Sequence, residues 1–143
     1  NILGVSQVFF LDYEDTKVPN NVDAIIKIEK IVREINPQRA YIPYHDEVHQ
    51  DHRNTHFNAI SACRNVSQVL MYEGPSTMNT FNVTFWIDID ATVKDKVAAI
   101  EAHVSQGQKQ ILKTDSIIGM NKFRGFQARC NQAEGFAVFR YLE

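Results

Sequence analysis

The sequence lacks several features that mark whole classes of protein. Its apolar runs all fall short of the roughly 18–20 residues that a membrane helix needs, and no signal peptide is visible. It has no block of Lys or Arg, and its formal net charge is −2, so we expect neither a membrane segment nor a nucleic-acid partner. No Gly-rich turn follows an apolar segment, which argues against a nucleotide-binding Rossmann domain.

Cysteine is also scarce. The two cysteines, Cys63 and Cys130, are too few and too far apart for a zinc ribbon. We expect both to be reduced thiols of a cytoplasmic protein, because disulfides are rare in that compartment.

What is present is an ordinary globular composition. Of the 143 residues, 44% are hydrophobic and 22% are charged, which is typical of a soluble protein of at most one domain. The chain opens with Asn-Ile-Leu-Gly-Val rather than Met and runs at once into a strand-like segment. We therefore expect it to be part of a longer protein.

Strand-like and helix-like patterns alternate along the chain. They predict strands over 5–13, 40–43, 66–72, 81–89 and 136–142, and helices over 22–35, 53–63, 93–106 and 108–128, the last with a break near Gly119. Asn36-Pro37 ends the first helix, because Pro disfavours helical geometry in the residue before it. This alternation predicts an α/β fold with a mostly parallel sheet.

Polar clusters follow three of the predicted strands, at 12–15, 44–52 and 73–77. Open α/β sheets bind ligands at the carboxyl ends of their strands. The middle cluster is the densest, and it contains His45, Asp46, Glu47, His49, Asp51 and His52. Imidazole binds zinc well, and carboxylates either bind it or orient the imidazole, so this cluster is the candidate site.

Spacing suggests roles within this cluster. His49 and His52 are three residues apart and share a face if the helix has begun there, so one can hold a metal while the other faces a substrate. Asp51 can accept the free ring N–H of a neighbouring His. We expect His56 on the polar face of the helix, outside the site, and His103 in structural packing.

Other residues carry milder expectations. His45 and Asp46 either line a substrate pocket or belong to a solvated loop. Arg124 contacts substrate or a neighbouring subunit, or forms a surface salt bridge. Trp86, Phe81 and Phe85 are expected in the core or in a subunit contact.

Five segments, in the family's order, resemble the LmbE-like, or PIG-L, family of zinc-dependent N-acetylglucosaminyl de-N-acetylases. They are 3–13, His49-Gln50-Asp51-His52-Arg53 with its HxDH pattern, 72–77, Ala102-His103-Val104-Ser105-Gln106, and Arg124-Gly125 followed by 133–136. The resemblance implies a Rossmann-like three-layer sandwich that is incomplete at its N-terminal side. It also implies that residues 1–143 form a single deacetylase domain, truncated at its N-terminus.

The resemblance implies roles as well. His52 is expected to bind Zn²⁺ or another divalent metal, and His49 to face the substrate and stabilise the oxyanion, supported by Asp51. The implied reaction hydrolyses the acetamide of an N-acetylglucosamine-type substrate and releases acetate. His45, Asp46 and Arg124 are the expected substrate-binding residues.

One departure from the family pattern stands out. The family's first motif, which supplies two further zinc ligands and the general base, is absent from these residues, and we expect it upstream of Asn1. Since a catalytic zinc normally has three protein ligands, we expect neither tight zinc binding nor catalysis from this fragment alone.

Two alternatives remain open. The chain could be a non-catalytic truncated homologue that acts as a binding or interaction module. A metallo-β-lactamase is the other, although Glu47 stands where its HxHxDH pattern has the first His. The exposed apolar strands also suggest a homo-oligomer.

Overall fold

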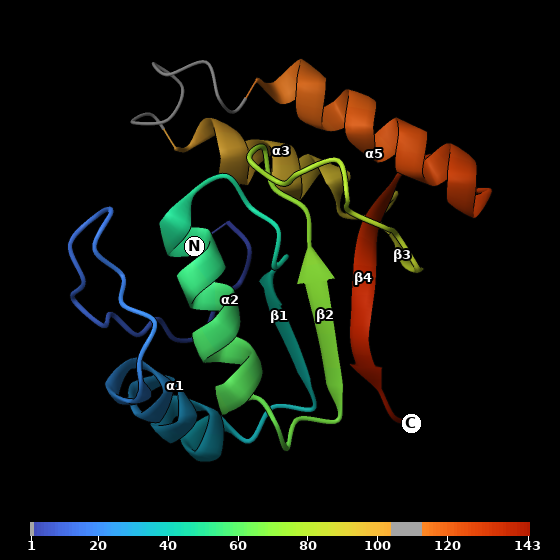
Figure 1. Cartoon of the computed structure of the whole chain (residues 1–143). Helices are drawn as coiled ribbons and strands as arrows, with labels where there is room; N and C mark the ends of the chain where they lie inside the picture. The colour runs from blue at the N-terminus through green and yellow to red at the C-terminus, as the bar shows by residue number, and fades with distance from the viewer. Residues whose placement is uncertain (1, 104–112) are drawn as a thin grey trace. The chain divides into compact units, whose positions relative to one another are not determined.

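The computed structural model describes residues 2–103 and 113–143. The chain divides into two compact units, one of Asn1–Phe10 and Trp86–Gly135 and the other of Leu11–Phe85 and Phe136–Glu143. Figure 1 labels the helices and strands. Every helix in the described residues is too short or too polar to cross a lipid bilayer.

The larger unit contains two helices and a parallel strand pair, namely α1 (Val22–Ile35), β1 (Arg39–Pro43), α2 (Gln50–Ala62) and β2 (Gln68–Tyr72). Strands β1 and β2 pair in parallel, from Arg39 opposite Gln68 to Pro43 opposite Tyr72. Their carboxyl ends therefore lie side by side (Figure 1). The loop that follows β1 is hydrogen-bonded to the loop that follows β2.

The core of this unit lies between α2 and the strands. Helix α2 packs against β1, and α1 packs against α2. The buried cluster consists of Ile42, Tyr44, Ala59, Cys63, Val66, Val69, Met71 and Ala137, with Phe81 packed against it as expected. Full burial of each of its larger aliphatic side chains, such as Ile42 and Val69, contributes about 1.5–3 kcal/mol.

The sheet is mixed, which corrects the expectation of a mostly parallel one. Its strand order is β1-β2-β4-β3, where β3 is Phe85–Asp88 and β4 is Ala133–Tyr141. Strand β4 runs antiparallel to β2, with Phe136 opposite Tyr72. Its side chains alternate between half-buried and exposed from Val138 onward, as in antiparallel strands with one solvated face. The predicted α/β class is confirmed.

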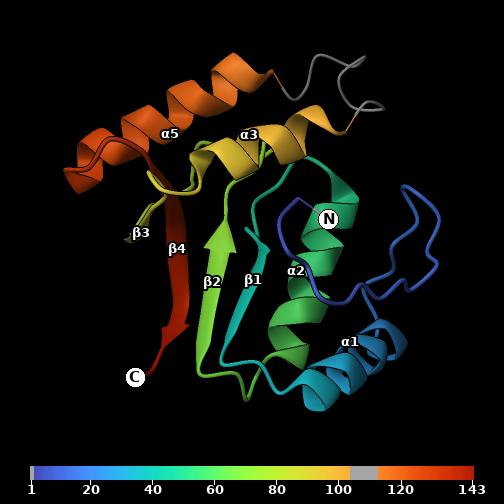
Figure 2. The same ribbon diagram turned by 180° about the vertical axis from the view of Figure 1, so that it is seen from behind.

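The smaller unit contains α3 (Val93–Glu101) and α5 (Thr114–Ala128), which lie side by side in both views (Figures 1 and 2). Helix α5 runs through Gly119 without the predicted break. Gly125 is a required glycine, because a Cβ there would lie 2.5 Å from the carbonyl oxygen of Asn131. The predicted helical residues within 104–112 lie outside the described residues.

The strand predicted over 5–13 is wrong. No strand is assigned there, and Phe10 is 81% exposed. A parallel strand needs a neighbouring backbone, and none of the described strands pairs with this segment. Both cysteines are free, as predicted, and burial raises the pKa of the Cys63 thiol.

Candidate functional site

The candidate site lies where the chain leaves β1 and β2. There the backbone N–H of Val48 donates to Ser76 at 2.9 Å, and that of Met78 donates to Asp46 at 2.9 Å. Glu47 and Thr77 form an isolated antiparallel bridge between these two bonds. The two strand-end loops are thus joined through their backbones, which fixes the side chains that they carry.

Glu47 lies at the centre of this junction and is 2% exposed. Its Oε2 accepts a hydrogen bond from Ser76 Oγ at 2.5 Å, and its Oε1 accepts one from the Thr77 hydroxyl. The Nδ1 atom of His52 lies 3.3 Å from Oε2. A buried carboxylate is costly unless it is well paired, and these three partners satisfy both oxygens.

His52 lies in the first turn of α2, and its side chain is 48% exposed. Because the Glu47 carboxylate accepts a hydrogen bond from Nδ1–H, the neutral ring keeps a lone pair on Nε2. A carboxylate behind one ring nitrogen with a free lone pair on the other is the usual arrangement of a metal-binding His. The donor chemistry here therefore fits zinc.

His49 caps the amino end of α2. Its Nδ1 accepts the backbone N–H of Asp51 at 3.2 Å, so the proton of the neutral ring is on Nε2. The ring centroids of His49 and His52 are 5.2 Å apart. The two rings therefore have opposite tautomers, one with a lone pair on Nε2 and the other with an N–H there.

Asp51 is 8% exposed, and its carboxylate holds a preceding loop. It accepts the backbone N–H groups of Thr16 at 2.7 Å and Val18 at 3.1 Å. Two residues that the sequence did not single out continue this contact along one face of α2. Asn54 donates to the carbonyl of Val18 and Asn58 donates to that of Pro19. Their spacing from Asp51, three and seven residues, was the available signal.

A second group at this corner is able to hold a cation. Ligand atoms of Asp15, His49 and Asp51 all lie within 4.8 Å of one another. Asp15 is exposed, and Asp51 already accepts two backbone hydrogen bonds. This group is therefore a weaker candidate than His52, but a metal-loaded structure would distinguish the two.

The predicted substrate-binding residues fall in different places. His45 is exposed beside the Tyr44 ring, and Asp46 accepts the Thr80 hydroxyl at 2.5 Å. Both lie in the loop that carries Glu47. Arg124 lies on α5, in the other unit, where it donates to Gln127.

His56 is buried, so its predicted place on a polar helix face is wrong. Its Nδ1–H donates to the carbonyl of Pro43 at 2.8 Å. Burial lowers the pKa of His56, and the nearby His45 lowers it further. The hydrogen bond to Pro43 acts in the opposite direction and raises this pKa. The error arose because α2 buries polar as well as apolar residues, so residue polarity does not identify its inner face.

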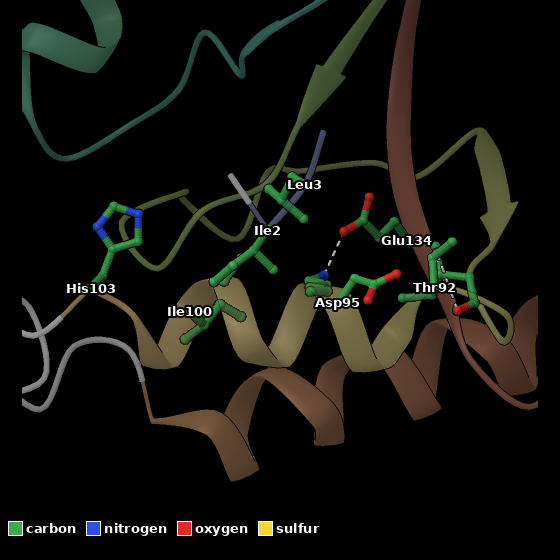
Figure 3. Close-up of a pocket in the computed structure, with 10 residues that line it drawn as sticks. Ile2, Leu3, Thr92, Asp95, Ile100, His103 and Glu134 are labelled. Atoms are coloured by element: carbon green, nitrogen blue, oxygen red, sulfur yellow. Dashed lines mark hydrogen bonds and ion pairs between the residues drawn. The ribbon is translucent and has the colours of Figure 1, made fainter. Parts of the chain in front are cut away.

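The smaller unit contains a separate cavity of about 480 Å³ (Figure 3). Its lining residue Lys96 is 2.5 Å from Glu134 and 2.9 Å from Asn121. His103 lines one end and is exposed rather than packed, contrary to expectation. Because Lys96 is neutralised by Glu134 and His103 is the sole imidazole in the described lining, this cavity is the weaker candidate.

Sequence comparison identifies relatives of this chain. Residues 1–63 match the family model for PIG-L, described as GlcNAc-PI de-N-acetylase. The chain is 30% identical over 115 residues to YaiS, an uncharacterized deacetylase of Escherichia coli (strain K12), and the match covers 73% of the chain. The chain is a relative of the PIG-L family. It spans 60% of the length of that curated relative.

Solved structures share the fold of this PIG-L relative. The conserved protein TT1542 from Thermus thermophilus matches with a TM-score of 0.86 at 21% identity, over 99% of this chain and 69% of that one. N,N'-diacetylchitobiose deacetylase from Pyrococcus horikoshii matches at 0.77 and 24%, over 96% and 59%. GalB, a 4-carboxy-2-hydroxymuconate hydratase from Pseudomonas putida, matches at 0.85 and 20%, over 99% and 69%. These likenesses establish the fold, and the hydratase among them means that fold alone does not identify the reaction.

Proposed function

We propose that the protein to which this chain belongs is a zinc-dependent N-deacetylase. Its substrate would carry an acetamide on an amino sugar of the N-acetylglucosamine type. The relationship to the PIG-L family and to a deacetylase supports the reaction class. The observation that carries the proposal is the pairing of His52 with buried Glu47 beside His49, at the carboxyl end of a strand.

His52 would hold the metal through Nε2, since Nδ1 faces Glu47. Bound zinc would lower the pKa of a water molecule to about 7 and polarise the amide carbonyl. A catalytic zinc normally has three protein ligands, so residues beyond His52 must take part. The family's first motif, where present in the parent protein, would supply them.

His49 would act on the substrate rather than on the metal. With Nδ1 engaged by the Asp51 N–H, its Nε2–H is the free donor. As water adds to the amide carbon, the carbonyl oxygen gains negative charge, and an N–H aimed at that oxygen stabilises it. The C–N bond then breaks, the amine leaves with a proton, and acetate remains. Asp51 keeps the His49 tautomer through its backbone N–H and fixes the adjoining loop through its carboxylate.

His45 and Asp46 would contact the sugar. His45 and Asp46 belong to the loop that carries Glu47, and their polar groups suit sugar hydroxyls. Arg124 belongs to the smaller unit, and its part in binding rests on the family resemblance. Substitution of each by Ala should raise KM more than it lowers kcat, because uniform binding would be lost.

The deciding experiment measures bound metal and acetate release from N-acetylglucosamine conjugates by the full-length protein. We expect both zinc and stoichiometric acetate. Zinc without acetate would point to another reaction on this fold, such as hydration of a carbon–carbon double bond. Neither zinc nor acetate would support the non-catalytic homologue instead.

A further inference from the structure

Glu47 performs no chemical step in the reaction proposed above, although it is the least exposed charged side chain among the described residues. Burying a carboxylate costs several kcal/mol before its partners are counted. Substituting a well-packed apolar residue is often neutral or stabilising, so such a group is weak evidence of a stabilising role. Its partners are therefore the guide to what it does.

Those partners all face the Glu47 carboxylate, which accepts from two hydroxyls and lies beside the His52 ring. The backbone N–H of Gly74 donates to Thr77 Oγ1 at 2.7 Å, which leaves the Thr77 hydroxyl proton for Glu47 Oε1. Ser76 donates to Oε2, the same oxygen that faces His52 Nδ1. Ser76 Oγ also lies 3.4 Å from His52 Nδ1. Because the Ser76 proton is donated to Glu47 at 2.5 Å, both oxygens near Nδ1 are acceptors, and Nδ1–H is the donor that suits them.

The backbone around Glu47 is held just as firmly. Arg53 donates through Nη1 to the carbonyl oxygens of Glu47 at 2.5 Å and Val48 at 2.6 Å. The bridge between Glu47 and Thr77 fixes the opposite side. Glu47 is thus fixed by contacts to its backbone as well as by hydrogen bonds to its carboxylate oxygens.

We propose that Glu47 is a positioning residue that keeps His52 protonated on Nδ1 and so presents Nε2 to the metal, with Ser76 and Thr77 holding Glu47 in turn. This inference rests on the proposed function, since it assigns the metal to His52. Glu47 does not serve as the general base, because it is nearly fully buried and both oxygens are occupied by hydroxyl donors and the ring.

The first test reads the His52 ring without any metal. Ring ¹⁵N chemical shifts of the metal-free, full-length protein should show His52 protonated on Nδ1. In Glu47→Gln, which keeps the shape but loses the charge, a measurable share of the Nε2–H form should appear. A wild-type ring protonated on Nε2, or an unchanged ring in the variant, would overturn the inference.

The second test measures zinc affinity by competition with a chromophoric chelator. Glu47→Gln should weaken zinc binding by about 10–100-fold, as removal of such outer partners usually does. Thr77→Val, which removes one donor at nearly constant shape, should weaken it less and in the same direction. Glu34→Gln, a matched change at an exposed position on α1, should leave it unchanged.

The outcomes separate the inference from the function on which it rests. If His52→Ala loses zinc while Glu47→Gln and Thr77→Val both bind it as wild type does, the inference is wrong and the proposed function stands. If wild type binds no zinc, the proposed function fails, and the ring ¹⁵N shifts still decide whether Glu47 sets the tautomer. Should Glu47→Gln not fold, Thr77→Val alone decides.

Discussion

Glu47 and Asp51 are four residues apart and both are buried, yet they are held by different kinds of partner. The Glu47 corner (Glu47, His52, Ser76 and Thr77) joins a carboxylate to two hydroxyls and an imidazole. The Asp51 clamp (Asp51, Asn54 and Asn58 against residues 16–19) joins side chains of α2 to backbone N–H and carbonyl groups.

The difference indicates what each carboxylate is for. Backbone partners fix the path of the chain, so the Asp51 clamp fastens the loop before α1 to α2. Side-chain partners of the Glu47 corner fix the orientation and protonation of a ring that is half exposed. Changes in the Asp51 clamp should therefore appear as lost stability, and changes in the Glu47 corner as altered metal binding.

The largest expected effect is at the exposed end of the Glu47 corner. His52→Ala in the full-length protein should remove most of the bound zinc, because it deletes the ligand itself. Metal analysis after dialysis against zinc-free buffer would measure this. Retention of zinc at the wild-type level would show that His52 does not bind the metal, and the Glu47 corner would then have no role in metal binding.

His49→Ala should keep zinc but lower kcat by about 10²–10³-fold, the usual loss when one oxyanion donor is removed. Steady-state kinetics and metal analysis of the same sample would give kcat and the amount of bound zinc. Zinc loss equal to that of His52→Ala would contradict the division between the two rings and would favour the group of Asp15, His49 and Asp51 as the metal site.

The Asp51 clamp should respond in stability. Asp51→Ala removes a charged acceptor from two backbone N–H groups and should cost about 1.5–3 kcal/mol in urea unfolding. Asp51→Asn keeps one acceptor oxygen, so it should cost less and spare the fold. A stable Asp51→Ala protein that has lost its zinc would show that this carboxylate serves the metal instead.

A smaller effect is expected from His56, which is buried on α2 and hydrogen-bonded to Pro43. Since burial lowers its pKa, the unfolded state binds its proton first as the pH falls. The free energy of unfolding should therefore fall below about pH 6.5, by at most about 1.4 kcal/mol per pH unit. His56→Asn can still donate to Pro43 and should remove this dependence. Equal pH dependence in both proteins would contradict it.

How far the sequence predicts this structure depends on how local the signal is. Helix α1 has the predicted bounds, because the apolar spacing over 22–35 and Asn36-Pro37 are local signals; the cap at Asn21 is added by the structure. Helix α2 begins three residues earlier than expected, since His49 supplies its own side chain as the cap. The strand at 5–13 and the direction of β4 failed, because both depend on which backbone lies alongside.

In the candidate site, too, the features with a local signal were predictable from the sequence and the non-local ones were not. The motif 49–53 and its position after a strand are local, and both were predictable. The role of Glu47 was not, because its partners Ser76 and Thr77 come from another strand end about thirty residues away. The sequence indicated Glu47 only as one member of the polar cluster at 44–52 and as a departure from another family's metal motif. The carboxylate of Asp51 likewise meets residues that lie 33 and 35 positions before it.

The most direct test of the account is the position of zinc in crystals of the zinc-loaded, full-length protein, located by anomalous scattering at the zinc edge. We expect a peak about 2.0–2.1 Å from Nε2 of His52, with Nδ1 still facing Glu47. A peak among Asp15, His49 and Asp51 with the His52 ring left unbound would contradict it.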